Sequence, residues 1–119
     1  MPVARQVRRT LPDIEKIEFD KEAQMGKVIQ KKILPEYFEA VYKGNKSFEL
    51  RKDDSNYEVG DWILLEEWDG REYTGRSLEC RIKYILRNVP EYGLKKGYCI
   101  LSIRVEKIGS YYKDGRQPL

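Results

Sequence analysis

Residues 44–52 carry the most information in this chain and read Gly44-Asn45-Lys46-Ser47-Phe48-Glu49-Leu50-Arg51-Lys52. The glycine can end a helix, and the residues after it predict a strand that contains a cation, an acid and a second cation. Side chains alternate between the two faces of a strand, so Phe48 and Leu50 are predicted to face the core. Ser47, Glu49 and Arg51 then share the other face, which offers hydrogen-bonding groups. Lys46 can join Glu49 only if the chain is still turning out of the helix there.

The composition allows one globular domain and excludes several kinds of catalysis. The chain has 119 residues, with 23 Lys and Arg against 20 Asp and Glu, so its net charge of +3 permits a polyanionic partner without requiring one. Histidine is absent, which excludes Ser-His-Asp and Cys-His arrangements and removes the commonest metal ligand. Cys80 and Cys99 lie in apolar runs without a CxxC spacing, so buried free thiols are predicted. We expect neither a cofactor nor a metal.

The chain divides into three segments. Residues 1–26 form an N-terminal extension in which Thr10, Pro12 and Asp13 predict a helix that runs to about Met25. Residues 27–107 form the domain, and residues 108–119 a polar, mobile tail. No apolar run approaches the roughly 20 residues that span a membrane, so we expect a cytoplasmic location and no membrane partner.

Short strands and one helix are predicted within the domain. Strands are expected at residues 28–33, around Glu49, and at 62–68, 78–84 and 97–107, with loops at 73–76 and 87–96. Pro35 begins a helix that ends at Gly44. Its predicted core positions are Tyr37, Phe38, Val41 and Tyr42. The core positions of the strand at 78–84 are Leu78, Cys80, Ile82 and Tyr84. The pattern predicts an α+β fold with a small mixed sheet that curls toward a barrel.

Several short motifs follow one another in a fixed order between residues 28 and 105. They are KILPEYF at 32–38, GxKxxExR at 44–51, VGD at 59–61, YTGR at 73–76, and the GL and GY pairs at 93–94 and 97–98. In these motifs the chain resembles the ASCH domains of the PUA-like superfamily, particularly a compact bacterial and phage subset of uncharacterised members. The resemblance implies a pseudo-barrel with one or two short helices. It also implies a cleft, floored by the GxKxxExR strand, that suits a nucleotide or an RNA segment.

Three charged residues are the central candidates for ligand binding. Lys46 and Arg51 can contact phosphate or a base edge, and Glu49 can accept hydrogen bonds from the exocyclic amine of cytosine or guanine. The alternative is that Glu49 and Arg51 pair with each other or with neighbouring strands.

Trp68, Tyr73 and Arg76 are peripheral candidates for the same ligand. The two aromatic residues flank the tip of a predicted hairpin, where they either stack a base or cap the core. Arg76 belongs either to a basic rim or to a solvated strand face. The six residues together predict a domain that binds RNA or a modified nucleotide.

Two other functions remain open. Some proteins of the resembling superfamily are small amidohydrolases that remove an acyl group from N4-acylated cytidine, with a lysine, a hydroxyl nucleophile and a carboxylate. Lys46 matches that lysine, but Glu49 stands where those enzymes place threonine. Lys46, Ser47 and Glu49 are therefore the catalytic candidates, with Ser47 as the hydroxyl. In the third hypothesis the domain is a regulator that binds a protein partner through residues 1–26 and the C-terminal tail.

Overall fold

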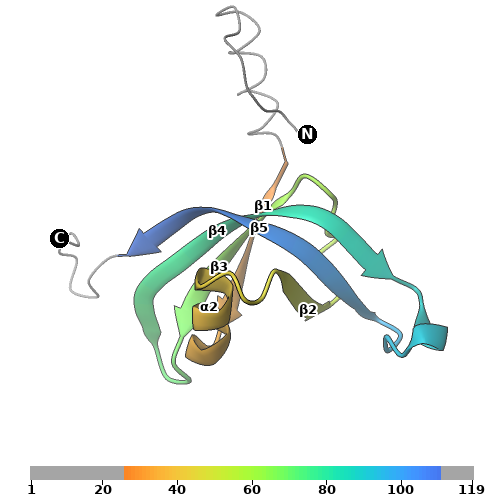
Figure 1. Cartoon of the computed structure of the whole chain (residues 1–119), viewed down its shortest axis with the longest axis horizontal. Helices are drawn as coiled ribbons and strands as arrows, with labels where there is room; N and C mark the ends of the chain where they lie inside the picture. Colours follow the sequence, from red (N-terminus) through yellow and green to blue (C-terminus); the bar gives the residue numbers. More distant parts are fainter. Residues whose placement is uncertain (1–25, 111–119) are drawn as a thin grey trace, which may run out of the picture.

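The computed structural model describes residues 26–110 (Figure 1). Its elements are β1 (Val28–Ile33), α2 (Pro35–Tyr42), β2 (Phe48–Lys52), β3 (Trp62–Trp68), β4 (Tyr73–Arg87), a short 3-10 helix (Pro90–Tyr92) and β5 (Tyr98–Ser110). The predicted strands at 28–33 and 62–68 and the helix start at Pro35 are confirmed. The helix predicted up to Met25 lies outside the described residues.

The five strands form one mixed sheet in the order β1-β3-β4-β5-β2. β1 runs parallel to β3, and the other neighbouring strands are antiparallel. The sheet curls into a half-barrel, with α2 on its inner side (Figure 1). β1 and β2 are the two edge strands, and we call the space between them the open seam. The α+β class and the curled mixed sheet are thus confirmed.

The helix α2 leads from β1 to the start of β2. Leu34 is extended and precedes Pro35, whose fixed φ and missing N–H suit the first position of a helix. Gly44 has a φ of +82°, which places it in the left-handed region that favours glycine and ends the helix as predicted. The N–H of Asn45 then donates to the carbonyl of Ala40 at 2.9 Å, so the chain is still turning after the helix has ended.

Buried side chains fill the inner side of the half-barrel. The largest are Phe38, Tyr57, Ile63, Leu65, Leu78, Ile82 and Leu101. Cys80 and Cys99 are also fully buried and form no disulfide, as predicted. Burial raises the pKa of the Cys80 thiol to about 12, which makes it a poor nucleophile in the folded protein.

The prediction that Phe48 and Leu50 belong to the core is wrong. The side chains of β2 alternate as expected, but Glu49 is 3% exposed whereas Phe48 and Leu50 are 46% and 57% exposed. Glu49 pairs across the sheet with the core residue Leu101, so the carboxylate is on the inner face and the two apolar side chains are on the outer face.

Three tyrosines predicted in the core are exposed. Tyr37 and Tyr42 are 45% and 49% exposed because this short helix buries only Phe38 and Val41. Tyr84 is 62% exposed. The register of β4 against β5 shifts between Ile82 and Tyr84, and the extra residue of this bulge turns Tyr84 to the outer face.

Two strands are longer than predicted. β4 begins at Tyr73, so residues 73–76 belong to a strand and not to a loop. β5 continues to Ser110, so residues 108–110 pair with β4 and are not part of a tail. Residues 111–119 lie outside the described part of the chain. Neither helix within residues 26–110 has the length and hydropathy that crossing a bilayer requires.

Candidate functional site

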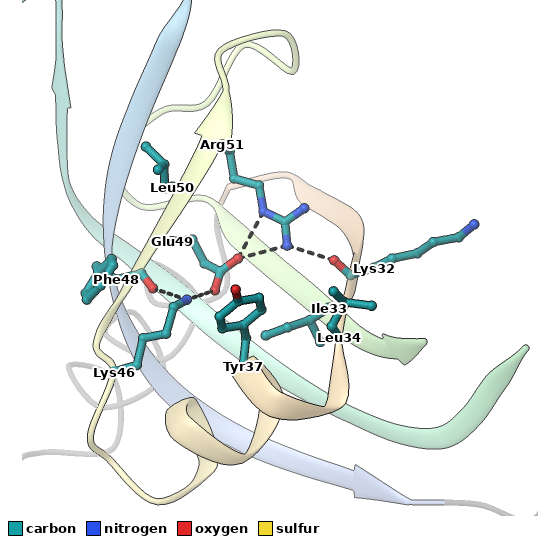
Figure 2. Close-up of a pocket in the computed structure, with 9 residues that line it drawn as sticks. All are labelled: Lys32, Ile33, Leu34, Tyr37, Lys46, Phe48, Glu49, Leu50 and Arg51. Atoms are coloured by element: carbon teal, nitrogen blue, oxygen red, sulfur yellow. Dashed lines mark hydrogen bonds and ion pairs between the residues drawn. The ribbon is translucent and has the colours of Figure 1, made fainter. Parts of the chain in front are cut away.

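A hollow of about 430 Å³ lies at the open seam, between the end of β1 and the strand β2 (Figure 2). It is lined by Lys32, Ile33, Leu34, Tyr37, Lys46, Phe48, Glu49, Leu50 and Arg51. The three central residues predicted from the sequence therefore lie together. Three of the lining side chains are cations and one is a carboxylate, so the hollow has an excess of positive charge.

The carboxylate of Glu49 lies between the two predicted cations (Figure 2). Its Oε2 pairs with the ammonium of Lys46, and its Oε1 accepts a hydrogen bond from Nε of Arg51 at 2.9 Å and lies 2.8 Å from Nη2 in the same ion pair. The side chain of Glu49 is 4% exposed, whereas those of Lys46 and Arg51 are 17% and 22% exposed. The pairing of Glu49 with Arg51, which the sequence left as an alternative, is thus present. A buried carboxylate is stabilised by this charge-assisted pairing, which also fixes both cations.

The position of Lys46 follows from the end of α2. Its backbone N–H donates to the carbonyl of Ala40 at 3.0 Å, so this residue still belongs to the turn that follows the helix. The condition under which Lys46 can reach Glu49 is therefore met. The ammonium also donates to the carbonyl of Phe48 at 2.7 Å.

The two cations cap backbone groups on both sides of the open seam. In the described sheet β2 pairs only with β5, and β1 only with β3. The ammonium of Lys46 bonds the Phe48 carbonyl on β2, and Nη2 of Arg51 bonds the Lys32 carbonyl on β1 at 2.8 Å. Arg51 thus links the two edge strands, and each of these two carbonyls has a side-chain donor.

Some donors of the two cations have no recorded acceptor. The hydrogen bonds within residues 26–110 use Nε and Nη2 of Arg51 but not Nη1, and they use two of the three ammonium hydrogens of Lys46. Both oxygens of Glu49 already accept hydrogen bonds. The hollow is therefore better equipped to donate hydrogen bonds to a ligand than to accept them, and an acceptor-rich or anionic group suits it best.

Six of the nine lining residues are not among the predicted ligand-binding residues, and two of these six, Tyr37 and Lys32, lie against the charged groups. Tyr37 was assigned to the core, but its side chain extends from α2 toward the charged groups, and its ring centroid lies 5.8 Å from the ammonium of Lys46 (Figure 2). The sequence indicates Lys32 only as part of a motif, although its backbone carbonyl accepts a hydrogen bond from Arg51. Both residues belong to the KILPEYF run, so that motif was the available signal for them.

Trp68 and Tyr73 do not line the hollow. They face each other at the end of the β3–β4 hairpin, with ring centroids 5.0 Å apart in an edge-to-face arrangement. The ammonium of Lys32 lies 3.8 Å from the centroid of the Trp68 ring, which is a cation–π contact. Lys32 therefore links this aromatic pair to the rim of the hollow.

Arg76 also lies outside the hollow, in a separate polar cluster. Its guanidinium donates to Glu67 at 2.9 and 3.0 Å and to Glu39 at 2.8 Å, and it covers the ring of Phe38 at 4.3 Å. Thr74 donates to Glu67 as well. The hydrogen bonds that Arg76 donates to Glu67 hold the pKa of Glu67 below its ordinary value, and the same bonds raise the pKa of Arg76. These contacts fasten α2 to the hairpin and give Arg76 a structural role.

The catalytic candidates are only partly brought together. Lys46 and Glu49 line the hollow, but Ser47 is exposed and is not among the lining residues. Its backbone carbonyl accepts a hydrogen bond from Ile103, which ties this residue into the sheet. Within residues 26–110 no group of three or more His, Cys, Asp and Glu residues could hold a metal ion.

Comparison with known proteins places the domain among sequences of unassigned function. The model of a family described as "Domain of unknown function (DUF3850)" matches residues 28–103, which include every residue that lines the hollow. The chain is 45% identical over 58 residues to the "Uncharacterized 12.9 kDa protein in GpA 3'region" of Escherichia phage P2. That match covers 49% of this chain and 53% of the phage protein, so the similarity spans about half of each.

Proposed function

This chain belongs to the DUF3850 family, and we propose that its domain binds a nucleotide, free or within RNA, in the hollow at the open seam. One observation carries the proposal: a buried carboxylate, Glu49, holds two partly exposed cations beside the hollow, and each cation keeps a donor that no group in the described part of the chain uses. A site of this kind is organised before the ligand arrives, so little ordering of the side chains is required on binding.

The excess of positive charge favours the phosphate of such a ligand. Among residues 26–110, Nη1 of the planar Arg51 guanidinium and one ammonium hydrogen of Lys46 have no hydrogen-bond acceptor. A phosphate oxygen can accept from both, and charge-assisted hydrogen bonds are about twice as strong as neutral ones. The same donors also match the carbonyl oxygen of a base.

The aromatic and apolar part of the lining suits a base. Tyr37 is 45% exposed at the side of the hollow, and Leu34, 48% exposed, adds apolar surface. Bases stack on aromatic rings largely without regard to sequence. The volume of about 430 Å³ lies within the range of sites for small molecules and nucleotides.

We also propose that the half-barrel is of the PUA-like kind, with the hollow as the ASCH-type cleft. The GxKxxExR motif supports this proposal because it supplies the three ionic groups of the hollow on or directly before β2. Acyl hydrolysis has weaker support, because Ser47 does not line the hollow. A protein-binding role for residues 1–26 concerns a part of the chain that lies almost wholly outside the described residues.

Thermal shift with the common nucleosides and nucleoside monophosphates tests the proposal. A ligand that binds the native state raises the melting temperature by mass action, and we expect the monophosphates to raise it more than the nucleosides. Arg51→Ala should lose this shift while remaining folded, whereas Lys43→Ala should keep it because Lys43 is exposed and lies outside the hollow. An equal shift in the folded Arg51→Ala variant would contradict the proposed site.

A further inference from the structure

The outer face of the sheet carries an apolar surface that the hollow does not explain. Six large side chains from β2, β5 and β4 lie there in neighbouring register positions. They are Phe48, Leu50, Ile100, Tyr98, Tyr84 and Leu86, and we call them the outer patch. Phe48, Leu50 and Tyr84 are 46%, 57% and 62% exposed, and the other three are half-buried. Exposed apolar surface of this extent on a small domain usually marks an interaction site.

The register fixes which side chains are neighbours. Phe48 lies opposite Ser102, which lies opposite Tyr84, so one row crosses three strands with an aromatic ring at each end. Adjacent strands are about 4.8 Å apart, so the backbones of β2 and β4 are about 10 Å apart at this row. The next row consists of Leu50, Ile100 and Leu86. The patch is thus an aromatic and aliphatic surface and not a single exposed residue.

Three lysines border the outer patch, and one of them, Lys46, is paired with Glu49. Lys52 pairs with Tyr98 in the third row, and the ammonium of Lys95 lies 5.6 Å from the centroid of the Tyr98 ring. The ammonium of Lys46 lies 5.0 Å from the centroid of the Phe48 ring. None of the described residues that make up the three rows is acidic. The occupant that fits best is therefore anionic and has flat apolar groups.

We propose that the outer patch binds single-stranded nucleic acid, with bases stacked on Phe48, Tyr84 and Tyr98 and phosphates near the surrounding lysines. Sheet-borne aromatic side chains combined with cations are a general means of binding single strands. Phe48 and Leu50 also line the hollow, and β2 lies at the edge of the sheet. A nucleic acid that places one nucleotide in the hollow can therefore continue over β2 onto the outer patch. This inference rests on the proposed function, in which the hollow binds one nucleotide, and extends the ligand to a polynucleotide.

Fluorescence anisotropy with the full chain and a labelled single-stranded RNA of about ten nucleotides tests this proposal. Tyr84→Leu keeps an apolar side chain and removes the ring, so we expect RNA affinity to fall about tenfold. Binding of nucleoside monophosphates should not change in this variant, because Tyr84 is not part of the hollow. Tyr42→Leu is the matched control, since Tyr42 is 49% exposed on α2, and it should leave both affinities unchanged.

The outcomes separate this proposal from the function proposed for the hollow. If monophosphates bind but Tyr84→Leu binds RNA as tightly as the parent, or if RNA does not bind, the outer patch is not a nucleic-acid surface. If monophosphates do not bind but Tyr84→Leu weakens RNA binding, the hollow proposal fails and the outer patch stands. Self-association that Tyr84→Leu abolishes, in sedimentation experiments without RNA, would assign the patch to a second copy of this chain. Binding to phosphatidylserine vesicles that the variant abolishes would assign it to a lipid surface, and either result overturns the proposal.

Discussion

Nη2 of Arg51 donates a 2.8 Å hydrogen bond to the backbone carbonyl of Lys32 and so joins the two edge strands of the half-barrel. The same nitrogen contacts Oε1 of Glu49 at 2.8 Å. One guanidinium therefore holds the seam together and orients the charged floor of the hollow. Fold and candidate site depend on the same side chain, and its substitution should affect both stability and binding.

Arg51→Lys should separate the charge of this residue from its geometry. A lysine keeps the positive charge, but its ammonium cannot reproduce the fork that reaches both Glu49 and the Lys32 carbonyl. We expect the free energy of unfolding to fall by about 1 kcal/mol, measured by urea denaturation. Nucleoside monophosphate affinity should fall about tenfold, measured by calorimetry. Arg104→Lys, at an exposed pair with Glu106, should change neither quantity. Parent-like stability and affinity of Arg51→Lys would show that the charge alone suffices.

Glu49→Gln should destabilise the domain more than an exposed substitution of the same kind. The amide cannot pair with two cations, which would remain partly buried beside it. We expect a loss of about 2 kcal/mol in urea denaturation, because the partial exposure of both cations reduces the penalty of a fully buried charge. Glu91→Gln, in the exposed 3-10 helix, should be neutral. Equal stability of the two variants would mean that Glu49 does not organise the cluster.

The Glu67–Arg76 contact should make the stability of the protein depend on pH in the acid range. The pKa of Glu67 in the folded state lies below its ordinary value of 4.5, chiefly because of hydrogen bonds from Arg76. A carboxyl with a lowered folded-state pKa contributes stability that is complete above the unfolded-state value and is lost as the pH falls through the folded-state value. At neutral pH, Glu67→Gln should therefore melt at a lower temperature than the parent, and the difference should shrink as the pH falls below about 4.5. A difference in melting temperature that is constant with pH would contradict this assignment.

Both thiols should be unreactive in the native protein. Cys80 and Cys99 are fully buried, and burial raises the pKa of each thiol, that of Cys80 to about 12. An aromatic disulfide reagent at mildly alkaline pH should label neither thiol until urea unfolds the chain, because the thiolate is the reactive form. Rapid labelling of the folded protein would show that the core opens more readily than its packing indicates.

Much of the fold could be predicted because local signals are strong. The strand Trp62–Trp68 lies between VGD and Asp69-Gly70, and both flanking motifs favour turns. The faces of β2 were separated correctly by alternation, but the choice of the buried face was wrong. Alternation does not specify which face packs inward, and here Lys46 and Arg51 compensate a buried Glu49.

The remaining differences arise from tertiary contacts. The sequence places Arg76 on a basic rim, but its contacts with Glu39 and Glu67, 37 and 9 residues away, form only in the folded chain. Tyr84 was assigned to the core because the bulge after Ile82 has no local sequence signal. The three central residues of the hollow were predicted together because one short motif contains all of them.

The most direct test of the central claim is an NMR titration of the parent protein with a nucleoside monophosphate, followed through its backbone amide signals. We expect saturable shifts confined to residues 32–37 and 46–51, and their loss in Arg51→Ala. Saturable shifts elsewhere with these two segments unchanged, or no shifts with any of the common monophosphates, would contradict the central claim.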